Sequence, residues 1–122
     1  HLGIKRPTWE TDPLGNSFGA GGLFLTLSEL HKFGLFYLNK GSWNGKQILS
    51  EKWIEESTSA SDTDDYGYLF WRGEHNSFRA DGKYSQITMV LPEKNAVVSL
   101  VAECRKGEEL MRALYDLVCA KI

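Results

Sequence analysis

Five consecutive residues in the second half of the chain could contribute to catalysis: Arg79, Ala80, Asp81, Gly82 and Lys83. They precede a long run of β-branched and apolar residues that predicts a strand. A glycine at this point lets a substrate approach the strand edge, and the next backbone N–H could donate to a developing oxyanion. A β-bulge or a bend with solvent-facing charges would explain the same five residues, so the pattern alone leaves both interpretations open.

No complete set of residues for nucleophilic catalysis accompanies this segment. The chain contains neither Ser-x-x-Lys nor a Gly-x-Ser-x-Gly nucleophile elbow. Tyr37 and Asn39 spell Tyr-x-Asn, a sequence that some serine hydrolases use for proton transfer. Tyr37 falls on the apolar stripe of a predicted helix and Asn39 at its end, so we interpret the match as a coincidence.

The sequence predicts no metal site and no cofactor. The three histidines are far apart, and the two cysteines add no zinc-binding spacing. Asp62, Asp64 and Asp65 lack the glycine and the terminal glutamate of a calcium-binding loop. Two cysteines do not make a disulfide framework, so we expect Cys104 and Cys119 to be free thiols.

Composition excludes several classes of protein. The 122 residues suffice for one domain with a modest core, and they are 42% hydrophobic and 25% charged. The net charge of −2, with acids and bases interspersed, offers no surface for nucleic acid or an anionic membrane. No apolar run approaches the ~20 residues of a membrane-spanning helix. The chain begins at His1 without a signal-peptide pattern, so we expect a processed protein or a fragment, and its compartment stays open.

The first half of the chain should be irregular and then helical. Proline, glycine and polar residues at short spacing predict an irregular connecting segment over residues 1–20. Its expected anchors onto a core are Leu2, Ile4, Trp9 and Leu14. Residues 21–58 form the helical part: Thr26 and the glutamate three residues later make a capping box for a helix over residues 27–38, and a serine caps a second helix over residues 51–58.

Residues 66–122 should form an antiparallel sheet and a covering helix, which gives an α+β fold. The expected elements are strands near residues 66–72 and 77–81, a long hairpin of residues 84–91 and 96–103, and a C-terminal helix over residues 108–121. Pro92 and Asn95 supply the chemistry of the hairpin turn. Asn44-Gly45, earlier in the chain, predicts a type I′ turn in a smaller hairpin.

Apolar spacing predicts which helix faces are buried. In the first helix the expected stripe consists of Leu27, Leu30, Gly34, Tyr37 and Leu38. In the second helix Trp53 and Ile54 should face inward. In the C-terminal helix the expected buried face consists of Leu110, Leu114, Leu117 and Val118.

Taken together, three segments resemble the C-terminal part of the serine β-lactamase family, which includes class C-type β-lactamases, D-alanyl-D-alanine carboxypeptidases and related esterases. The segments are GAGGLFLTLSELHKFGLFYLNKGSWNGKQILSEKWIEEST, DDYGYLFW and FRADGKYSQITMVLPEKNAVVSLVA. The resemblance covers about residues 14–104. It implies that residues 1–122 are a single fragment, the C-terminal portion of a larger two-lobed serine hydrolase.

The resemblance also implies a role for the charged segment. Family enzymes carry a Lys- or His-x-Gly motif on the strand that lines the active site, and here it maps to Ala80-Asp81-Gly82. Gly82 matches, and the Lys83 N–H becomes the expected oxyanion donor. Ala80 departs from the basic residue, so either this branch dispenses with that charge or it uses another residue, such as Arg79. The departure puts β-lactam hydrolysis in doubt more than the fold.

Three functions stay open. The resemblance implies acyl transfer on a β-lactam, a D-Ala-D-Ala-like amide or a small ester, with a small-molecule or peptidoglycan-like substrate; the chain alone would be inactive because Ser-x-x-Lys is absent. The first alternative is a non-catalytic relative that binds a ligand or partner. The second is a small interaction domain that uses its aromatic segment, residues 66–71. An uncovered sheet face or edge would also let the fragment self-associate.

Overall fold

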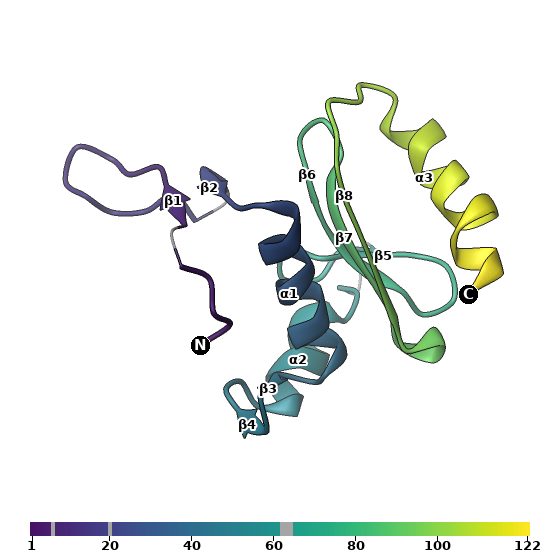
Figure 1. Cartoon of the computed structure of the whole chain (residues 1–122), viewed down its shortest axis with the longest axis horizontal. Helices are drawn as coiled ribbons and strands as arrows, with labels where there is room; N and C mark the ends of the chain where they lie inside the picture. Colours follow the sequence, from purple (N-terminus) through teal and green to yellow (C-terminus); the bar gives the residue numbers. More distant parts are fainter. Residues whose placement is uncertain (6, 20, 62–64) are drawn as a thin grey trace.

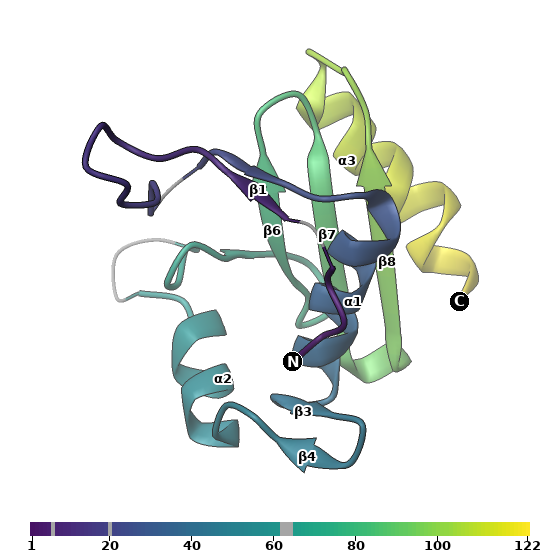
Figure 2. The same ribbon diagram turned by 60° about the vertical axis from the view of Figure 1, so that its left-hand side comes forward.

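The computed structural model describes residues 1–5, 7–19, 21–61 and 65–122, and it confirms the α+β class. Its centre is an antiparallel sheet of four strands in the order β5-β6-β7-β8. Helix α1 lies on one face of this sheet and helix α3 on the other (Figures 1 and 2). Two of the three aspartates compared above with a calcium-binding loop, Asp62 and Asp64, lie outside the described residues.

The long hairpin forms as predicted, with shorter strands. Strand β7 spans Gln86–Leu91 and pairs with β8, Ala96–Val101. A 3-10 turn over Pro92–Lys94 joins them, and Asn95 leaves it in the left-handed conformation with φ of 50°. Asparagine tolerates this conformation better than most residues, which explains its place at the exit.

The aromatic strand predicted near residues 66–72 is largely absent. Only β5, Trp71–Arg72, is a strand, and Tyr66 makes an isolated bridge to Trp71. Leu69 has φ of 67°, a left-handed conformation that interrupts a strand. Strand β6, Phe78–Gly82, agrees with the predicted strand near residues 77–81.

The helices of the first half have the predicted ends. Helix α1 spans Leu27–Leu38 and begins with the complete Thr26 capping box, while α2 spans Glu51–Thr58. Between them, β3 (Ser42–Trp43) and β4 (Lys46–Gln47) form the small hairpin. Its turn residues, Asn44 and Gly45, have φ of 50° and 75°, as a type I′ turn requires.

The N-terminal segment is more ordered than the sequence predicts. Strand β1, Thr8–Trp9, pairs with β2, Leu23–Phe24, in an arm that extends away from the sheet (Figure 1). Leu2 packs against the core and Ile4 is half-buried. Trp9 and Leu14, also expected as anchors, are 46% and 88% exposed. The Trp9 indole instead donates to backbone carbonyls within the arm, so it orders the arm locally.

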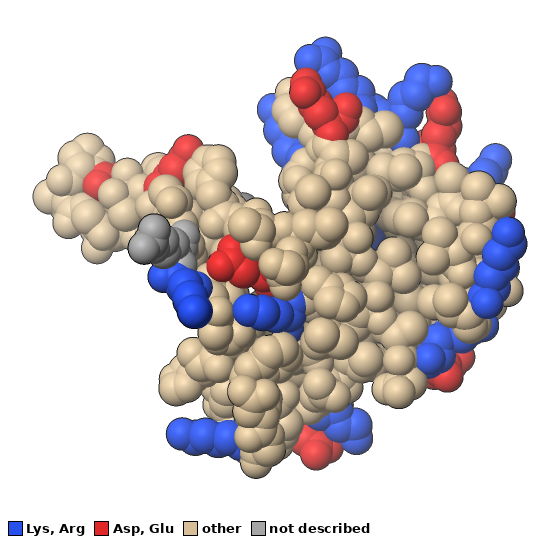
Figure 3. All heavy atoms as spheres, in the orientation of Figure 1, with Lys and Arg blue, Asp and Glu red and all other residues tan. Residues whose placement is uncertain are grey.

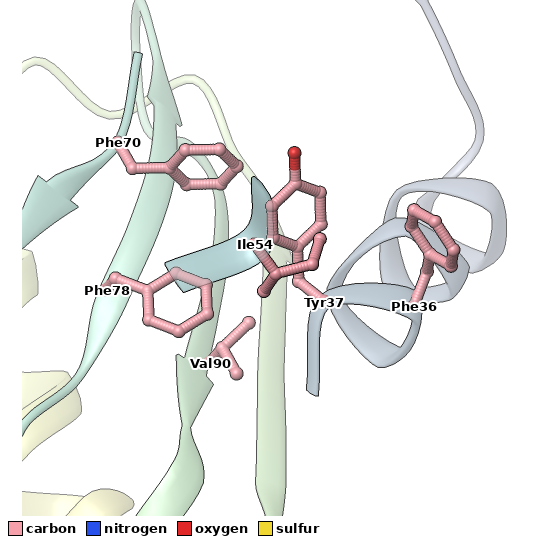
Figure 4. Close-up of a cluster of buried hydrophobic side chains, with 6 residues drawn as sticks. All are labelled: Phe36, Tyr37, Ile54, Phe70, Phe78 and Val90. Carbon is pink, nitrogen blue, oxygen red and sulfur yellow. The ribbon is translucent and has the colours of Figure 1, made fainter. Parts of the chain in front are cut away.

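One hydrophobic cluster joins α1 and α2 to the sheet. It contains Phe36, Tyr37, Ile54, Phe70, Phe78 and Val90. Figure 4 shows the Tyr37 side chain directed from α1 toward Phe70 and Phe78. The three rings lie 4.7–6.2 Å apart in tilted and edge-on arrangements. Trp53, expected to face inward, is 43% exposed, so only Ile54 of that pair joins the core.

A second cluster lies between the opposite sheet face and α3, which spans Gly107–Leu117 and is followed by a 3-10 turn over Cys119–Lys121. Leu114 and Cys119 are buried, and Met111 and Tyr115 pack beside them. Leu117 and Val118 are exposed, contrary to the predicted face. The α-helix ends before Val118, so the last residues do not continue its spacing.

Candidate active-site strand

The free edge of β6 is the principal feature of the candidate site. Strand β7 pairs with all five residues of β6, whereas β5 pairs only with Phe78 and Arg79. Within the part of the chain that the structure describes, no strand covers the β5 side of Ala80, Asp81 and Gly82. An extended substrate can therefore lie along this edge and use its backbone groups.

Alternation along β6 separates the candidate residues onto two faces. Ala80 lies on the same face as Phe78 and packs against the α1-side cluster. Arg79 and Asp81 lie on the opposite face, in register with Met89 and Ile87 of the α3-side cluster. Ala80, at the basic position of the expected Lys- or His-x-Gly motif, and its possible substitute, Arg79, therefore face opposite sides of the sheet.

Arg79 already has partners on its own face. Its Nε lies 3.0 Å from Asp81 Oδ2, and the two side chains are 18% and 25% exposed. Its guanidinium carbon lies 5.9 Å from the centre of the Trp71 ring, a cation–π contact. The ion pair neutralises both charges, so neither Arg79 nor Asp81 presents a free charge to the α1 side.

Gly82 brings the two strands close together at the end of the hairpin. A Cβ atom added to Gly82 would lie 3.2 Å from the Gln86 Cβ, which is tighter than ordinary van der Waals contact. The Gly82 carbonyl accepts a hydrogen bond from the Ser85 N–H at 3.1 Å. Because the C=O and N–H of a trans peptide point in opposite directions, the Lys83 N–H points away from Ser85. Among the described residues it has no hydrogen-bond acceptor.

The turn that follows is held in an unusual conformation. Tyr84 and Ser85, predicted to begin the long strand, instead have φ of 63° and 71°. The Tyr84 carbonyl accepts from the Cys104 N–H at 3.1 Å, and the Ser85 hydroxyl donates to the Cys104 carbonyl at 3.3 Å. These two bonds fix the β6–β7 turn against the end of β8.

Two cationic side chains gather on this turn. Lys83 Nζ lies 5.0 Å and Arg105 Cζ 5.6 Å from the centre of the Tyr84 ring. Neither Tyr84 nor Arg105 is among the site residues predicted from the sequence. The predicted pairing of the long hairpin could have indicated both residues, because it brings the start of one strand next to the end of the other.

The Tyr-x-Asn match is structural, as predicted. Tyr37 is buried in the α1-side cluster, and burial raises the pKa of its phenol. A raised pKa keeps the hydroxyl protonated, which is unsuited to a general base. Asn39 caps the end of α1, where its N–H bonds to the Leu35 and Tyr37 carbonyls.

The cysteines are free, as predicted, and Cys119 is buried with its Sγ 3.9 Å from Met89 Sδ. Burial raises the pKa of the Cys119 thiol. Across the described residues, no group of three or more His, Cys, Asp or Glu side chains could hold a metal ion. In the same residues, no helix has the length and apolar character needed to cross a membrane.

Comparison of the structure with solved structures identifies a match over most of the chain. "Putative 6-aminohexanoate-dimer hydrolase from Bacillus anthracis" superposes with a TM-score of 0.73 at 22% sequence identity. The likeness establishes a shared fold. It covers 88% of this chain and 31% of the other, so the chain spans about a third of that protein's length. The match supports a β-lactamase-like fold. No protein-family model and no curated protein matches the sequence.

Proposed function

We propose that residues 1–122 are the C-terminal part of a serine hydrolase with a β-lactamase-like fold. In the complete enzyme, it performs acyl transfer on a β-lactam, a D-Ala-D-Ala-like amide or a small ester. Residues 1–20 are a connecting segment, residues 21–58 form the helical part, and residues 66–122 supply the sheet and the final helix. The observation that carries the proposal is the free edge of β6, where the Lys83 N–H has no acceptor among the described residues.

In this reaction a serine outside residues 1–122 attacks the substrate carbonyl through its Oγ and passes its hydroxyl proton to a base, also outside this segment, which later gives a proton to the leaving group. A carbon–oxygen bond forms while the carbonyl oxygen becomes an oxyanion, to which the Lys83 N–H donates. Collapse of this intermediate expels the amine or alcohol, which takes up a proton, and leaves an acyl-enzyme. Water then hydrolyses the acyl-enzyme through a second oxyanion in the same place.

Ala80 and Gly82 have different roles in the proposed site. Ala80 presents only a methyl group toward α1 and supplies no charge, whereas Gly82 allows the turn to close next to the donor N–H. We therefore favour a small ester or an amide over a β-lactam. The 6-aminohexanoate dimer, which appears in the name of the hydrolase from Bacillus anthracis, is one amide to test.

Acylation by a fluorescent penicillin, followed by intact mass, tests the proposal. The full-length protein should gain one acyl group, from penicillin or from a chromogenic ester, whereas residues 1–122 alone should gain none. Labelling of residues 1–122 alone would contradict a nucleophile outside this segment. A folded full-length protein that reacts with neither compound would favour the alternative, a non-catalytic relative that binds a ligand or partner at the β6 edge.

The sheet also has a second free edge. Among the described residues β8 pairs only with β7, and its residues 96–100 are half-buried while Val101 is exposed. Unpaired N–H and C=O groups on an apolar strand favour pairing with another chain. Residues 1–122 alone should therefore self-associate through β8.

A further inference from the structure

A pocket of about 540 Å³ lies at the opposite end of β6 from Gly82, where α1, α2 and the start of that strand meet. Its volume is in the range of small-molecule sites. The apolar part of its wall consists of Tyr37, Leu38, Ile54, Ala60, Phe78 and Pro92. Figure 4 shows three of these side chains, Tyr37, Ile54 and Phe78, gathered between α1 and the sheet. Since Phe78 and Gly82 are four residues apart on an extended strand, the pocket lies about 13 Å from Gly82.

Arg72 places a positive charge in the wall of this pocket, and its own neighbours hold it there. The side chain is half-buried, and its Nη1 donates to the Thr58 carbonyl at 3.2 Å. Its Nη2 donates to the carbonyl and the side-chain oxygen of Asn76. The guanidinium carbon lies 6.0 Å from the centre of the Phe78 ring. Because these contacts position the guanidinium before any ligand arrives, the entropy cost of binding at this group is low.

The contacts of Arg72 leave its charge unpaired within the part of the chain that the structure describes. All three acceptors are neutral oxygens, and none of the ion pairs between described residues includes Arg72. A guanidinium has five N–H donors, so two of them have no described acceptor. A carboxylate on a ligand would supply both the missing acceptor and the missing counter-charge.

The other charged residues in the lining do not compensate Arg72. Lys40 is paired with Glu51, whose Oε2 lies 3.3 Å from the Lys40 Nζ. Glu55 is exposed, so solvent screens its carboxylate. Figure 3 shows basic and acidic side chains interspersed over the face that it draws, without a broad patch of one charge. The preference for an anion therefore comes from Arg72 itself.

We propose that this pocket binds a small monocarboxylate with an apolar chain, such as a short fatty acid. The carboxylate accepts hydrogen bonds from the Arg72 guanidinium, and the chain packs against Tyr37, Ile54 and Phe78. A guanidinium discriminates a carboxylate from a neutral amide through charge-assisted hydrogen bonds, and the apolar wall discriminates a long chain from a short one. The proposal does not depend on acyl transfer, because the free edge of β6 at residues 80–82 takes no part in it.

Binding is measured by NMR titration of the full-length protein with three probes. These are sodium hexanoate, hexanamide, which lacks the charge, and sodium acetate, which lacks the chain. Hexanoate should shift the signals of Thr58, Arg72 and Phe78 saturably and should bind about tenfold or more tightly than either of the others. The difference from hexanamide reflects the charge-assisted hydrogen bond. The difference from acetate reflects buried methylene groups, each of which contributes about fourfold.

Two variants with matched controls locate the site. Arg72→Gln removes the charge and should weaken hexanoate binding about tenfold or more, whereas Arg112→Gln, an exposed change on α3, should bind like the wild type. Ala60→Trp adds a bulky side chain to the lining without removing a contact of Arg72, and it should also weaken binding. Ala120→Trp, an exposed change near the C-terminus, should not. An unchanged circular dichroism spectrum and thermal midpoint show that a variant is folded, and Ala60→Trp decides if Arg72→Gln is not.

Equal affinities for hexanoate and hexanamide, shifts confined to residues outside the pocket, or wild-type binding by Ala60→Trp would overturn the proposal. The test is also separate from that of the proposed function. Hexanoate binding by a protein that acylates no substrate would support this site and contradict acyl transfer. Acylation without hexanoate binding would do the reverse.

Discussion

Gly34 of α1 faces Thr88 of β7 so closely that a Cβ atom on Gly34 would lie 2.5 Å from the Thr88 hydroxyl oxygen. The same atom would lie 2.6 Å from a methyl carbon of Val97 on β8. The helix therefore approaches the sheet at a position that only glycine can occupy without displacement of its neighbours. This contact sets the distance between α1 and the two strands of the long hairpin, β7 and β8.

Replacement of Gly34 by alanine should lower the free energy of unfolding. Overpacking costs about 1–3 kcal/mol, against about 1 kcal/mol gained from the higher helix propensity of alanine. Urea unfolding measures the difference, and Val97→Ala serves as the second background because it removes one of the two contacts. Gly34→Ala should cost less in Val97→Ala than in the wild type. An equal loss of unfolding free energy in the wild type and in Val97→Ala would show that the contact with Val97 does not cause the destabilisation.

Leu69 offers a stabilising substitution. It is 58% exposed with φ of 67°, so glycine should relieve about 1–2 kcal/mol of backbone strain while little apolar burial is lost. We expect Leu69→Gly to raise the thermal midpoint. The matched control is Leu14→Gly: Leu14 is 88% exposed without a positive φ, so that change should lower stability by about 0.5–1 kcal/mol. A lower midpoint for Leu69→Gly would contradict the strain argument.

The capping box of α1 should make stability depend on pH. Hydrogen bonds from the Thr26 N–H and hydroxyl lower the pKa of the Glu29 carboxyl in the folded chain. A depressed folded pKa gives stability that is present above the unfolded pKa and is lost as pH falls through the folded value. Unfolding free energy should therefore fall between about pH 5 and pH 3 more steeply in the wild type than in Glu29→Gln. Glu55→Gln, an exposed change on α2, should keep the wild-type slope.

The boundaries of α1 and α2 were predictable because local side chains set them. Thr26 and Ser50 each accept a hydrogen bond from a backbone N–H three residues later, and this spacing is visible in the sequence. The Asn44-Gly45 turn was predictable for the same reason. In such cases the interacting groups are neighbours in the chain.

The wrong predictions concern residues whose conformation or burial depends on contacts between residues that are distant in the sequence. Tyr84 looked like the first residue of a strand, but the bonds of the turn to Cys104 hold it in a left-handed conformation. Trp9 and Leu117 have core-like side chains, yet both are exposed because no described element lies over them. At the candidate site, Arg79 adjoins Ala80 in sequence, and only strand alternation shows that the two face opposite sides.

The role of the Lys83 N–H can be separated from that of its side chain. Lys83→Pro removes the backbone donor, whereas Lys83→Ala keeps the donor and removes only the ammonium. For a neutral ester, Lys83→Pro in the full-length protein should lower kcat by about 10²–10³, the usual effect of one lost oxyanion donor. Lys83→Ala should stay near the wild-type rate with that ester. Similar losses of kcat in both variants would show that the backbone N–H makes no specific contribution to catalysis.

Self-association of residues 1–122 should depend on β8. Val101, at the end of this strand, is 43% exposed. A lysine there places a charge at the unpaired edge, which disfavours strand pairing between chains. Light scattering across a concentration series should show larger species for the wild type than for Val101→Lys. Leu14→Lys adds the same charge on the N-terminal arm and should not change the association. A monomer at every concentration would contradict the proposal.

Residues on one face of β6 can be substituted without an effect on the residues of the other face. Since Ala80 projects toward α1 while Arg79 and Asp81 hold each other on the α3 side, a single substitution at position 80 could introduce a basic group without disturbing that ion pair. A one-residue insertion before Arg79 would do the opposite, because it would exchange the faces and turn the ion pair toward the apolar cluster around Phe78. Relatives of this chain can therefore gain or lose a charge at this strand by point substitution, whereas changes in strand length are strongly disfavoured.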